Sequence, residues 1–505
     1  MQTVRIPGAC LRGAQAEIVS VEAWFAPARG ASGGERTEVA LSGLPDAVVR
    51  DARTRVMSAL ERTGLAPGPG RLHVNLVPAG RKKRGELLDL PLALAAAGAA
   101  GHVESRRLSR TLFLGELGID GRLHDVPGAL AAAAAGREQG LERVVASPGA
   151  AREAAHLPGV QAIAVRSLEE AFATLWDRGP RPLAAPEPTP VARDASGLSS
   201  VRGQPLGQHA AEVAAAGGHG LLFVGPPGTG KSLLARALHG LLPPPSLDER
   251  IEVTRLLSAL GRWPGGLVRE RPFRAPHHTV SFAGLVGGGS PPRAGEITLA
   301  HRGLLFLDEL PEFKRDVLET LRQPLESGRV ILSRATGRLE LPASFQLVAA
   351  MNPCPCGFLG HPQRACRDAP SAVRRYRDRI SGPLLDRIDL RVELGPPSVA
   401  SLTDGEPSSD GAAVSLARVD RARARALERH PGRPNARLDS DDLDRVAPLE
   451  PEARRFLEAV AERGHLSARA IQSLRRVART LSDLDGSETP RRDHLAQALE
   501  LRGEV

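Results

Sequence analysis

Apolar residues recur at two different spacings in the first part of the chain, from Val4 to about Trp176. Spacing typical of strands covers residues 17–24 and 71–77, and spacing typical of a helix covers Ala47–Thr63. The alanine-rich run over residues 128–136 predicts a further helix. Strands that alternate with helices in this way predict one α/β or α+β unit.

A second unit is predicted from about Val201 to Leu394, where short apolar strands each end in a loop with reactive side chains. The predicted strands are Leu221–Val224, Leu304–Leu307 and residues 345–350. Short continuous apolar runs of this kind are typical of strands that are buried on both faces. The loops that follow these strands are therefore the first candidates for a site.

Two stretches without apolar periodicity separate the predicted units. Residues 179–199 are rich in Pro, Ala and Ser, and residues 395–413 are rich in Pro, Ser, Gly and Asp, as in linkers. Beyond Val414, apolar residues at helical spacing predict a helical region. The predicted organisation is a domain over residues 1–180, a linker over 181–200, a core over 201–395, a flexible connection over 396–413 and a helical domain over 414–505.

Composition limits the classes to which the chain can belong. With 505 residues, of which 42% are hydrophobic and 25% charged, it needs several cores. Its apolar runs stay well below the roughly 18 residues of a membrane helix, and its start has no secretory signal pattern, so we expect a cytoplasmic protein without a membrane partner. Four cysteines in such a chain exclude a disulfide framework. The net charge of +9 favours a polyanionic partner, although an arginine-rich composition would give the same excess.

The loop after the first strand of the second unit carries the strongest motif. Its sequence is Gly225-Pro226-Pro227-Gly228-Thr229-Gly230-Lys231-Ser232, and helical sequence follows at once. Glycines let backbone N–H groups close around phosphate oxygens, and a helix N-terminus adds partial positive charge. We expect Lys231 to reach the β- and γ-phosphates of ATP and Ser232 to ligate Mg²⁺.

Two later strand ends supply candidate catalytic groups. Asp308 is expected to hold the Mg²⁺ shell, and the adjacent Glu309 is expected to polarise the attacking water. Asn352 is expected to orient water near the γ-phosphate, although an asparagine before Pro353 is also an ordinary turn residue. A strand that ends in Asp-Glu says little by itself, but together with the phosphate loop it predicts ATP hydrolysis.

Further motifs give the chain a specific family resemblance. They comprise residues 271–279, Gly287-Gly288-Gly289, residues 292–301, 307–313, 351–357 and 384–389. Through these motifs nearly the whole chain resembles the magnesium-chelatase-like AAA+ ATPases of the YifB/ComM family. The resemblance implies an α/β P-loop AAA+ core with a C-terminal helical lid domain. It also implies a preceding α+β domain similar to the proteolytic domain of Lon-type proteases, and a hexameric ring with ATP sites between subunits.

The same resemblance assigns roles to two arginines. Arg387 is implied to be the arginine finger that enters a neighbouring subunit's site, a group that accelerates related enzymes by about three to five powers of ten. Arg469 is implied to be the second sensor, which acts in cis from the helical lid. In so basic a chain an arginine also commonly forms a surface salt bridge, so the flanking motifs carry these assignments.

The N-terminal domain lacks the groups of a peptidase. Residues 85–94 lie where the similar proteases carry a nucleophilic serine, and they contain none. No lysine lies between Lys83 and Lys231, so a serine–lysine dyad cannot form. We expect an ATP hydrolase that is not a peptidase, with an N-terminal scaffold or partner-binding domain.

A cysteine cluster follows Asn352. Three cysteines share one loop with His361 and an aspartate, which is enough for a tetrahedral Zn²⁺ site, and a metal-free reduced loop is the alternative. The family pattern has a cysteine in the place of the aspartate. The predicted zinc ligands are Cys354, Cys356, Cys366 and Asp368.

Basic residues gather before the glycine turn, at Arg271, Arg274, His277 and His278, and again over residues 374–379. In a ring motor such loops could grip a phosphate backbone, or they could form ion pairs between subunits. The positive run over residues 81–84 is expected to be a solvated face.

These observations predict a homo-hexameric AAA+ ATPase, with ATP and Mg²⁺ as cofactors and Zn²⁺ as a candidate structural metal. By resemblance it is a ComM-like branch-migration helicase that acts on single-stranded or branched DNA in recombination or transformation, with recombination proteins as candidate partners. Two alternatives remain open: a chelatase-type motor that drives metal insertion with a partner subunit, and a protein-remodelling regulatory ATPase. Stimulation of ATP hydrolysis by DNA would separate them.

Overall fold

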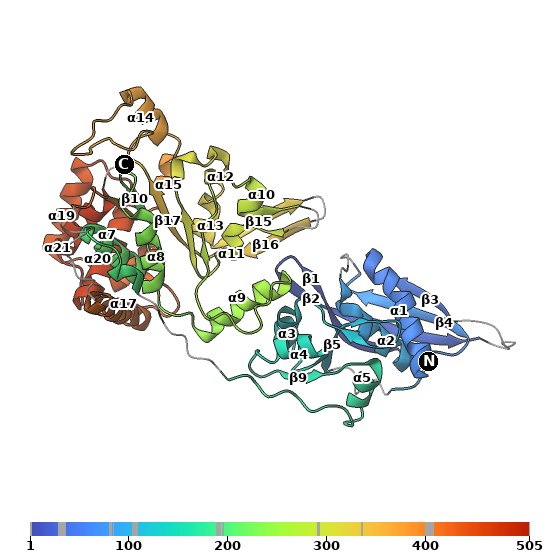
Figure 1. The fold of residues 1–505 in the computed structure, drawn as a ribbon. Coiled ribbons are helices and arrows are strands. Elements are labelled where there is room, and N and C mark those ends of the chain that lie inside the picture. Colours follow the sequence, from blue (N-terminus) through green and yellow to red (C-terminus); the bar gives the residue numbers. More distant parts are fainter. Residues whose placement is uncertain are drawn as a thin grey trace. The chain divides into compact units, whose positions relative to one another are not determined.

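The computed structural model describes residues 3–28, 37–79, 83, 85–103, 110–187, 193, 196–289, 293–334, 337–398 and 409–503. The chain forms two compact units (Figure 1). The first comprises Met1–Thr189 with Ser246–Arg269, and the second comprises Pro190–Pro245 with Glu270–Val505. Among the described helices, none has the length and apolar character needed to cross a bilayer.

The first unit begins with a four-stranded sheet in the order β1-β2-β4-β3. The strands are β1 (Val4–Arg12), β2 (Gln15–Pro27), β4 (Gly70–Val77) and β3 (Thr37–Ser42), and all pairs are antiparallel except β3 with β4. Alternate residues of β4 are buried, as the strand period requires. The helices α1 (Ala47–Thr63) and α2 (Asp89–Ala99) pack against each other, and α2 also packs on this sheet.

Helix α1 has the bounds that the apolar pattern predicts, because both of its ends are marked by the sequence. The carboxylate of Asp46 accepts the N–H of Val49 at 2.9 Å, which caps the first turn. The helix ends at Gly64, whose φ of 72° is in the left-handed region that favours glycine.

A second, parallel sheet completes the first unit, with the order β5-β8-β9. Alanine-rich α3 packs closely on its neighbours because its side chains are small. The remaining elements are η1 (Glu86–Leu88), β5 (Thr111–Leu114), β6 (Glu116–Leu117), β7 (Leu123–His124), α3 (Ala129–Glu138), β8 (Arg143–Ala146), α4 (Pro148–Ala154), β9 (Gln161–Ala164) and α5 (Leu168–Thr174).

Helix α9 (Leu247–Ala259) also belongs to the first unit, although the sequence pattern assigned it to the core over residues 201–395. It starts with a capping box, in which Ser246 and Glu249 bond to each other's backbone N–H at 3.2 and 3.0 Å. It packs on α3, and Ile251 and Leu267 join the apolar cluster around that helix. The segment is therefore held by side-chain packing far from its neighbours in sequence.

The second unit is built on a five-stranded parallel sheet in the order β11-β14-β17-β10-β18. The strands are β11 (Phe273–Arg274), β14 (Leu304–Leu307), β17 (Gln346–Met351), β10 (Leu221–Val224) and β18 (Leu390–Glu393). Strands β10 and β14 have their predicted bounds, and each is buried along its whole length. Because all five strands run in one direction, the loops after them meet at one edge of the sheet.

Short helices and two small hairpins surround this sheet. They are α6 (Ser196–Ser199), α7 (Pro205–Gly217), α8 (Lys231–Leu241), α10 (Phe282–Val286), β12 (Gly287–Gly288), β13 (Arg293–Ala294), α11 (Glu296–Leu299), η3 (Leu310–Glu312), α12 (Arg315–Glu319), α13 (Arg322–Ser327), β15 (Arg329–Arg334), β16 (Gly337–Pro342), α14 (Pro370–Arg377) and α15 (Gly382–Leu385). Part of the predicted linker over residues 181–200 is the helix α6, whereas residues 188–192 and 194–195 lie outside the described residues.

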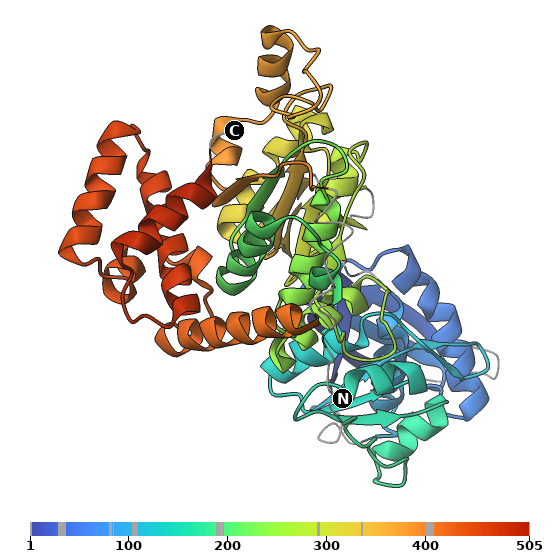
Figure 2. The same ribbon diagram turned by 60° about the vertical axis from the view of Figure 1, so that its left-hand side comes forward.

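The last part of the second unit is helical, as the sequence predicts. It contains α17 (Ser409–Arg429), η4 (Asn435–Arg437), α18 (Ser440–Val446), α19 (Pro451–Arg463), α20 (Ala468–Asp485) and α21 (Arg492–Arg502), which Figure 2 shows in orange and red. Helix α20 packs on α21, α17 and α7, so these helices share one core cluster with β10. Helix α17 starts inside the predicted flexible connection over residues 396–413, of which residues 399–408 lie outside the described part of the chain.

Candidate nucleotide site and cysteine cluster

The phosphate loop, Asp308 and Asn352 meet at the carboxyl edge of the parallel sheet in the second unit. The hydroxyl of Ser232 donates a hydrogen bond to Oδ2 of Asp308 at 2.7 Å. The ammonium group of Lys231 donates to Oδ1 of Asn352 at 3.1 Å. The structure thus brings together four predicted site residues from three separate loops, because β10 lies beside β17 and β17 lies beside β14.

The loop itself has a backbone that requires glycine at particular positions. Gly228 and Gly230 have φ values of 83° and 85°, in the left-handed region. A Cβ atom at Gly225 would lie 2.6 Å from the carbonyl oxygen of Leu394, so a side chain there would collide with backbone. The buried hydroxyl of Thr229 donates to the carbonyl oxygen of Pro226 at 2.9 Å. The two left-handed glycines and the Thr229 hydrogen bond give the loop the shape of a tight arch directly before α8.

The residues present fit a nucleoside triphosphate with Mg²⁺. The ammonium group of Lys231 also donates to the carbonyl oxygens of Gly225 and Pro226, at 2.6 and 2.9 Å, so it lies over the arch. Burial lowers the pKa of Lys231, although the charges of Asp308 and Glu309 act in the opposite direction. Within the described residues, no side chain caps α8, which leaves its first N–H groups for an anion.

Glu309 adopts a backbone conformation that is rare outside glycine, with φ of 53°. Its Oε2 lies 3.1 Å from Nδ1 of His278, and its side chain is 55% exposed, so the carboxylate is open to solvent yet held. The ring of His278 also contacts the rings of His277 and Phe313. Sequence reasoning placed His278 in a basic loop and missed this pair, because nothing local in the sequence links the two residues.

The two arginines that the family resemblance singled out share one carboxylate. Arg387 and Arg469 both form ion pairs with Oε1 of Glu326 on α13. The hydrogen bond from Arg469, together with the charge of Arg387, lowers the pKa of Glu326. The pairs seen among the described residues thus join Arg387 and Arg469 to Glu326 rather than to the phosphate loop. No local sequence pattern marks Glu326 as their counterion.

Several of the basic residues that the sequence grouped together have partners inside the same chain. Arg274 pairs with Glu296 through contacts of 2.6 and 2.8 Å, and Arg379 pairs with Glu312 at 2.9 Å. By contrast, Arg374 and Arg375 on α14 are exposed. Of the run over residues 81–84, only Lys83 lies within the described residues, and it is buried rather than solvated.

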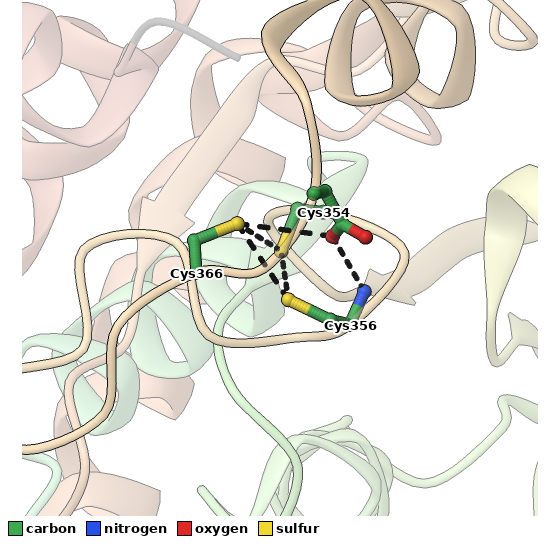
Figure 3. A group of neighbouring side chains, drawn as sticks. Cys354, Cys356 and Cys366 are labelled. Carbon is green, nitrogen blue, oxygen red and sulfur yellow. Dashed lines mark hydrogen bonds between the residues drawn. The ribbon is translucent and has the colours of Figure 1, made fainter.

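The cysteine loop between β17 and α14 gathers four potential metal ligands (Figure 3). One ligand atom from each predicted zinc ligand lies within 4.8 Å of all the others. His361 is in the same loop but outside this group, and its Nδ1 accepts the backbone N–H groups of Gln363 and Arg364 at 3.0 and 3.1 Å. The members of the group are Cys354, Cys356, Cys366 and Asp368.

Three family models match the chain. The model "Magnesium chelatase, subunit ChlI" matches residues 197–402, which include the phosphate loop and the cysteine loop. The model "Magnesium chelatase, subunit ChlI C-terminal" matches residues 409–502, and "Subunit ChlI of Mg-chelatase" matches residues 30–149.

Similar proteins occur in several bacteria. The chain is 40% identical to the uncharacterized protein YifB of Escherichia coli over 468 residues, which are 91% of this chain and 90% of that protein. It is 38% identical to the competence protein ComM of Haemophilus influenzae over 504 residues, or 98% and 96% of the two chains. An uncharacterized protein of Mycobacterium tuberculosis is 41% identical over 500 residues, which are 97% of each chain.

The parallel sheet with its phosphate loop and the matched models define a magnesium-chelatase-like protein with a P-loop AAA+-type fold. Within that class, the chain belongs to the YifB/ComM family, to whose members it is similar over 91% of its length or more.

Proposed function

We propose that this protein hydrolyses ATP and uses the free energy of hydrolysis to remodel DNA. The observation that carries the first part is the convergence of Lys231, Ser232, Asp308 and Asn352 at the end of three neighbouring parallel strands. Such a convergence of an ammonium, a hydroxyl and a carboxylate beside a helix N-terminus suits a bound nucleoside triphosphate.

Each residue of this site has a distinct proposed role. The loop N–H groups and Lys231 bind the phosphates, while Ser232 and Asp308 hold Mg²⁺, which neutralises phosphate charge when bound. Glu309 accepts the proton of the attacking water, and Asn352 orients that water. Glu309 suits this role because its carboxylate is exposed and is held in place by His278.

The arginines are proposed to act across a subunit boundary in a hexameric ring. Arg387 serves as the arginine finger for a neighbouring site. Because Arg469 contacts the same carboxylate oxygen as Arg387, we assign it to the same neighbouring site rather than to the cis role expected from resemblance. The helices α17 to α21, which carry Arg469, then form the lid domain, and the first unit is a Lon-like domain without peptidase activity.

DNA is the proposed substrate of the motor. The supporting observations are the similarity to a competence protein, the net charge of +9 and the exposed arginines of α14. Exposed arginines bind the phosphates of DNA, and this binding weakens steeply as the salt concentration rises.

ATP hydrolysis measured with and without single-stranded or forked DNA tests this proposal. We expect DNA to raise the rate severalfold at moderate salt, and Lys231→Ala to abolish hydrolysis under both conditions. The double variant Arg374→Ala with Arg375→Ala should lose most of the stimulation. Its matched control is Arg454→Ala with Arg455→Ala, which removes two exposed arginines from α19 and should keep the stimulation. If the parent protein hydrolyses ATP at the same rate with and without DNA, the proposal that it acts on DNA is refuted.

A chelatase-type motor is the second candidate, because all three matched models describe magnesium chelatase subunits. That motor would hydrolyse ATP faster with a chelatase partner subunit and would be indifferent to DNA. Stimulation by an unfolded protein client would instead favour a protein-remodelling ATPase.

A further inference from the structure

The loop between β17 and α14 brings three thiols and one carboxylate to a common centre (Figure 3). The Sγ atoms of Cys354 and Cys356 are 3.3 Å apart, and the Sγ atom of Cys366 is 3.6 Å from each of them. Oδ2 of Asp368 is 3.8 Å from the Sγ atom of Cys366. Four ligands around a tetrahedral ion with bonds of about 2.3 Å are themselves about 3.8 Å apart, so these separations are those of a coordination shell.

We propose that these four residues hold a structural Zn²⁺ ion. Thiolates select a soft or borderline ion such as zinc over Mg²⁺ or Ca²⁺. Four protein ligands close the tetrahedron and leave no position for water, which is typical of structural rather than catalytic sites. The proposal does not depend on the ATPase function.

A disulfide does not account for the cluster. A disulfide requires sulfur atoms about 2.05 Å apart, and all three cysteines are present as thiols. Moreover, three cysteines that are mutually close would leave one thiol over in any pairing. A central cation, in contrast, uses all of them together with the carboxylate.

Backbone groups around the cluster orient its ligands, as second-shell groups do in metal sites. The N–H of Leu359 donates to the Sγ atom of Cys354 at 3.3 Å. The N–H of Cys356 donates to Oδ2 of Asp368 at 2.8 Å, which turns this carboxylate toward the sulfur atoms.

The position of the cluster indicates what the ion does. Asn352 lies two residues before Cys354, the first member of the cluster. Gly357, in the same loop, abuts the phosphate loop so closely that a Cβ atom there would lie 2.7 Å from Cδ of Pro227. Gly357 has a left-handed φ of 82°, so glycine is needed for both conformation and space. The ion therefore clamps the loop that carries Asn352 against the loop that binds phosphate.

Metal analysis of the full-length protein tests the proposal. We expect one zinc per chain after purification without added metal, and cobalt exchange should give the visible spectrum of a tetrahedral thiolate site. Cys366→Ser should lose zinc. Cys10→Ser is the matched control, because Cys10 is buried in β1 of the other unit, and it should keep the full zinc content.

Two further variants keep the test decisive if Cys366→Ser fails to fold. Asp368→Cys should retain zinc and resist chelators better than the parent, because a fourth thiolate replaces the carboxylate. Lys231→Ala should also retain zinc, so a failed ATPase proposal would leave this result standing. The inference is overturned if the parent protein is purified without zinc, or if the Cys366→Ser variant keeps its zinc. It is also overturned if thiol titration shows that two of the cysteines are lost to a disulfide.

Discussion

At the scale of single residues, the Glu309 carboxylate depends on its partner His278. Replacing this proton acceptor should slow ATP hydrolysis without weakening ATP binding. In Glu309→Gln we expect unchanged ATP affinity and a turnover that falls by about two to four powers of ten. Fluorescent-nucleotide titration and phosphate release measure the two quantities separately. Undiminished turnover would remove Glu309 from the role of base.

His278→Ala leaves the base in place but removes the contact of 3.1 Å that holds it. We expect kcat to fall roughly tenfold with little change in KM, since misplacement of a catalytic group costs rate rather than affinity. The neighbouring His277→Ala is the control, because the Nδ1 atom of His277 contacts Thr279 rather than Glu309. An equal loss in both variants would indicate a general disturbance of the loop.

Mixed rings test whether Arg387 and Arg469 serve the same neighbouring site. Each of Arg387→Ala, Arg469→Ala and Lys231→Ala should be inactive alone. Mixtures of Lys231→Ala with either arginine variant should regain hydrolysis, because some interfaces then pair an intact phosphate loop with an intact arginine. If Arg469 acted in cis, only the mixture with Arg387→Ala would recover.

At the scale of secondary-structure elements, α20 contains an ion pair with no exposure to solvent. Arg479 and Asp483 are 2.7 Å apart, and both side chains are 0% exposed. Asp483→Ala would leave a buried guanidinium without this carboxylate, so we expect the second unit to lose about 3–5 kcal/mol of stability. Circular dichroism during urea unfolding measures the change. Asp485→Ala, whose side chain is 50% exposed, should change stability far less.

The sequence predicted those elements that carry their own local signals. Strands β10 and β14 are uninterrupted apolar runs, and α1 has a capping aspartate before it and a glycine after it. The convergence of the phosphate loop with Asp308 follows from parallel strands alone. The membership of α9 in the first unit and the contacts of His278 and Glu326 depend on tertiary packing, which has no local signature. Helix α17 likewise begins inside a stretch whose composition predicts a linker.

At the scale of the whole molecule, the two units can be followed separately. The three tryptophans, Trp24, Trp176 and Trp263, all lie in the first unit, so tryptophan fluorescence reports on that unit alone. The first unit also contains Asp89, a carboxyl whose pKa burial raises from 3.8 to about 6, although Arg55 opposes the shift. Burial likewise raises the pKa of Glu153 in this unit.

A raised carboxyl pKa makes the first unit more stable in its protonated form. The contribution of Asp89 is fully present below about pH 4 and is lost as the pH rises toward about 6. A pKa shift of this size corresponds to about 3 kcal/mol of folding free energy. Fluorescence-detected unfolding of Asp89→Asn should show a smaller loss of stability over this interval than the parent. Identical pH profiles would contradict the assignment.

The route of the chain between the units has a mechanical consequence. Since residues 246–269 leave the second unit, pack on α3 in the first and then return, the polypeptide passes between the units three times. A protease cut between residues 189 and 190 would therefore not detach the N-terminal fragment. The nicked protein should give two bands on a denaturing gel and yet elute from a sizing column as a single species.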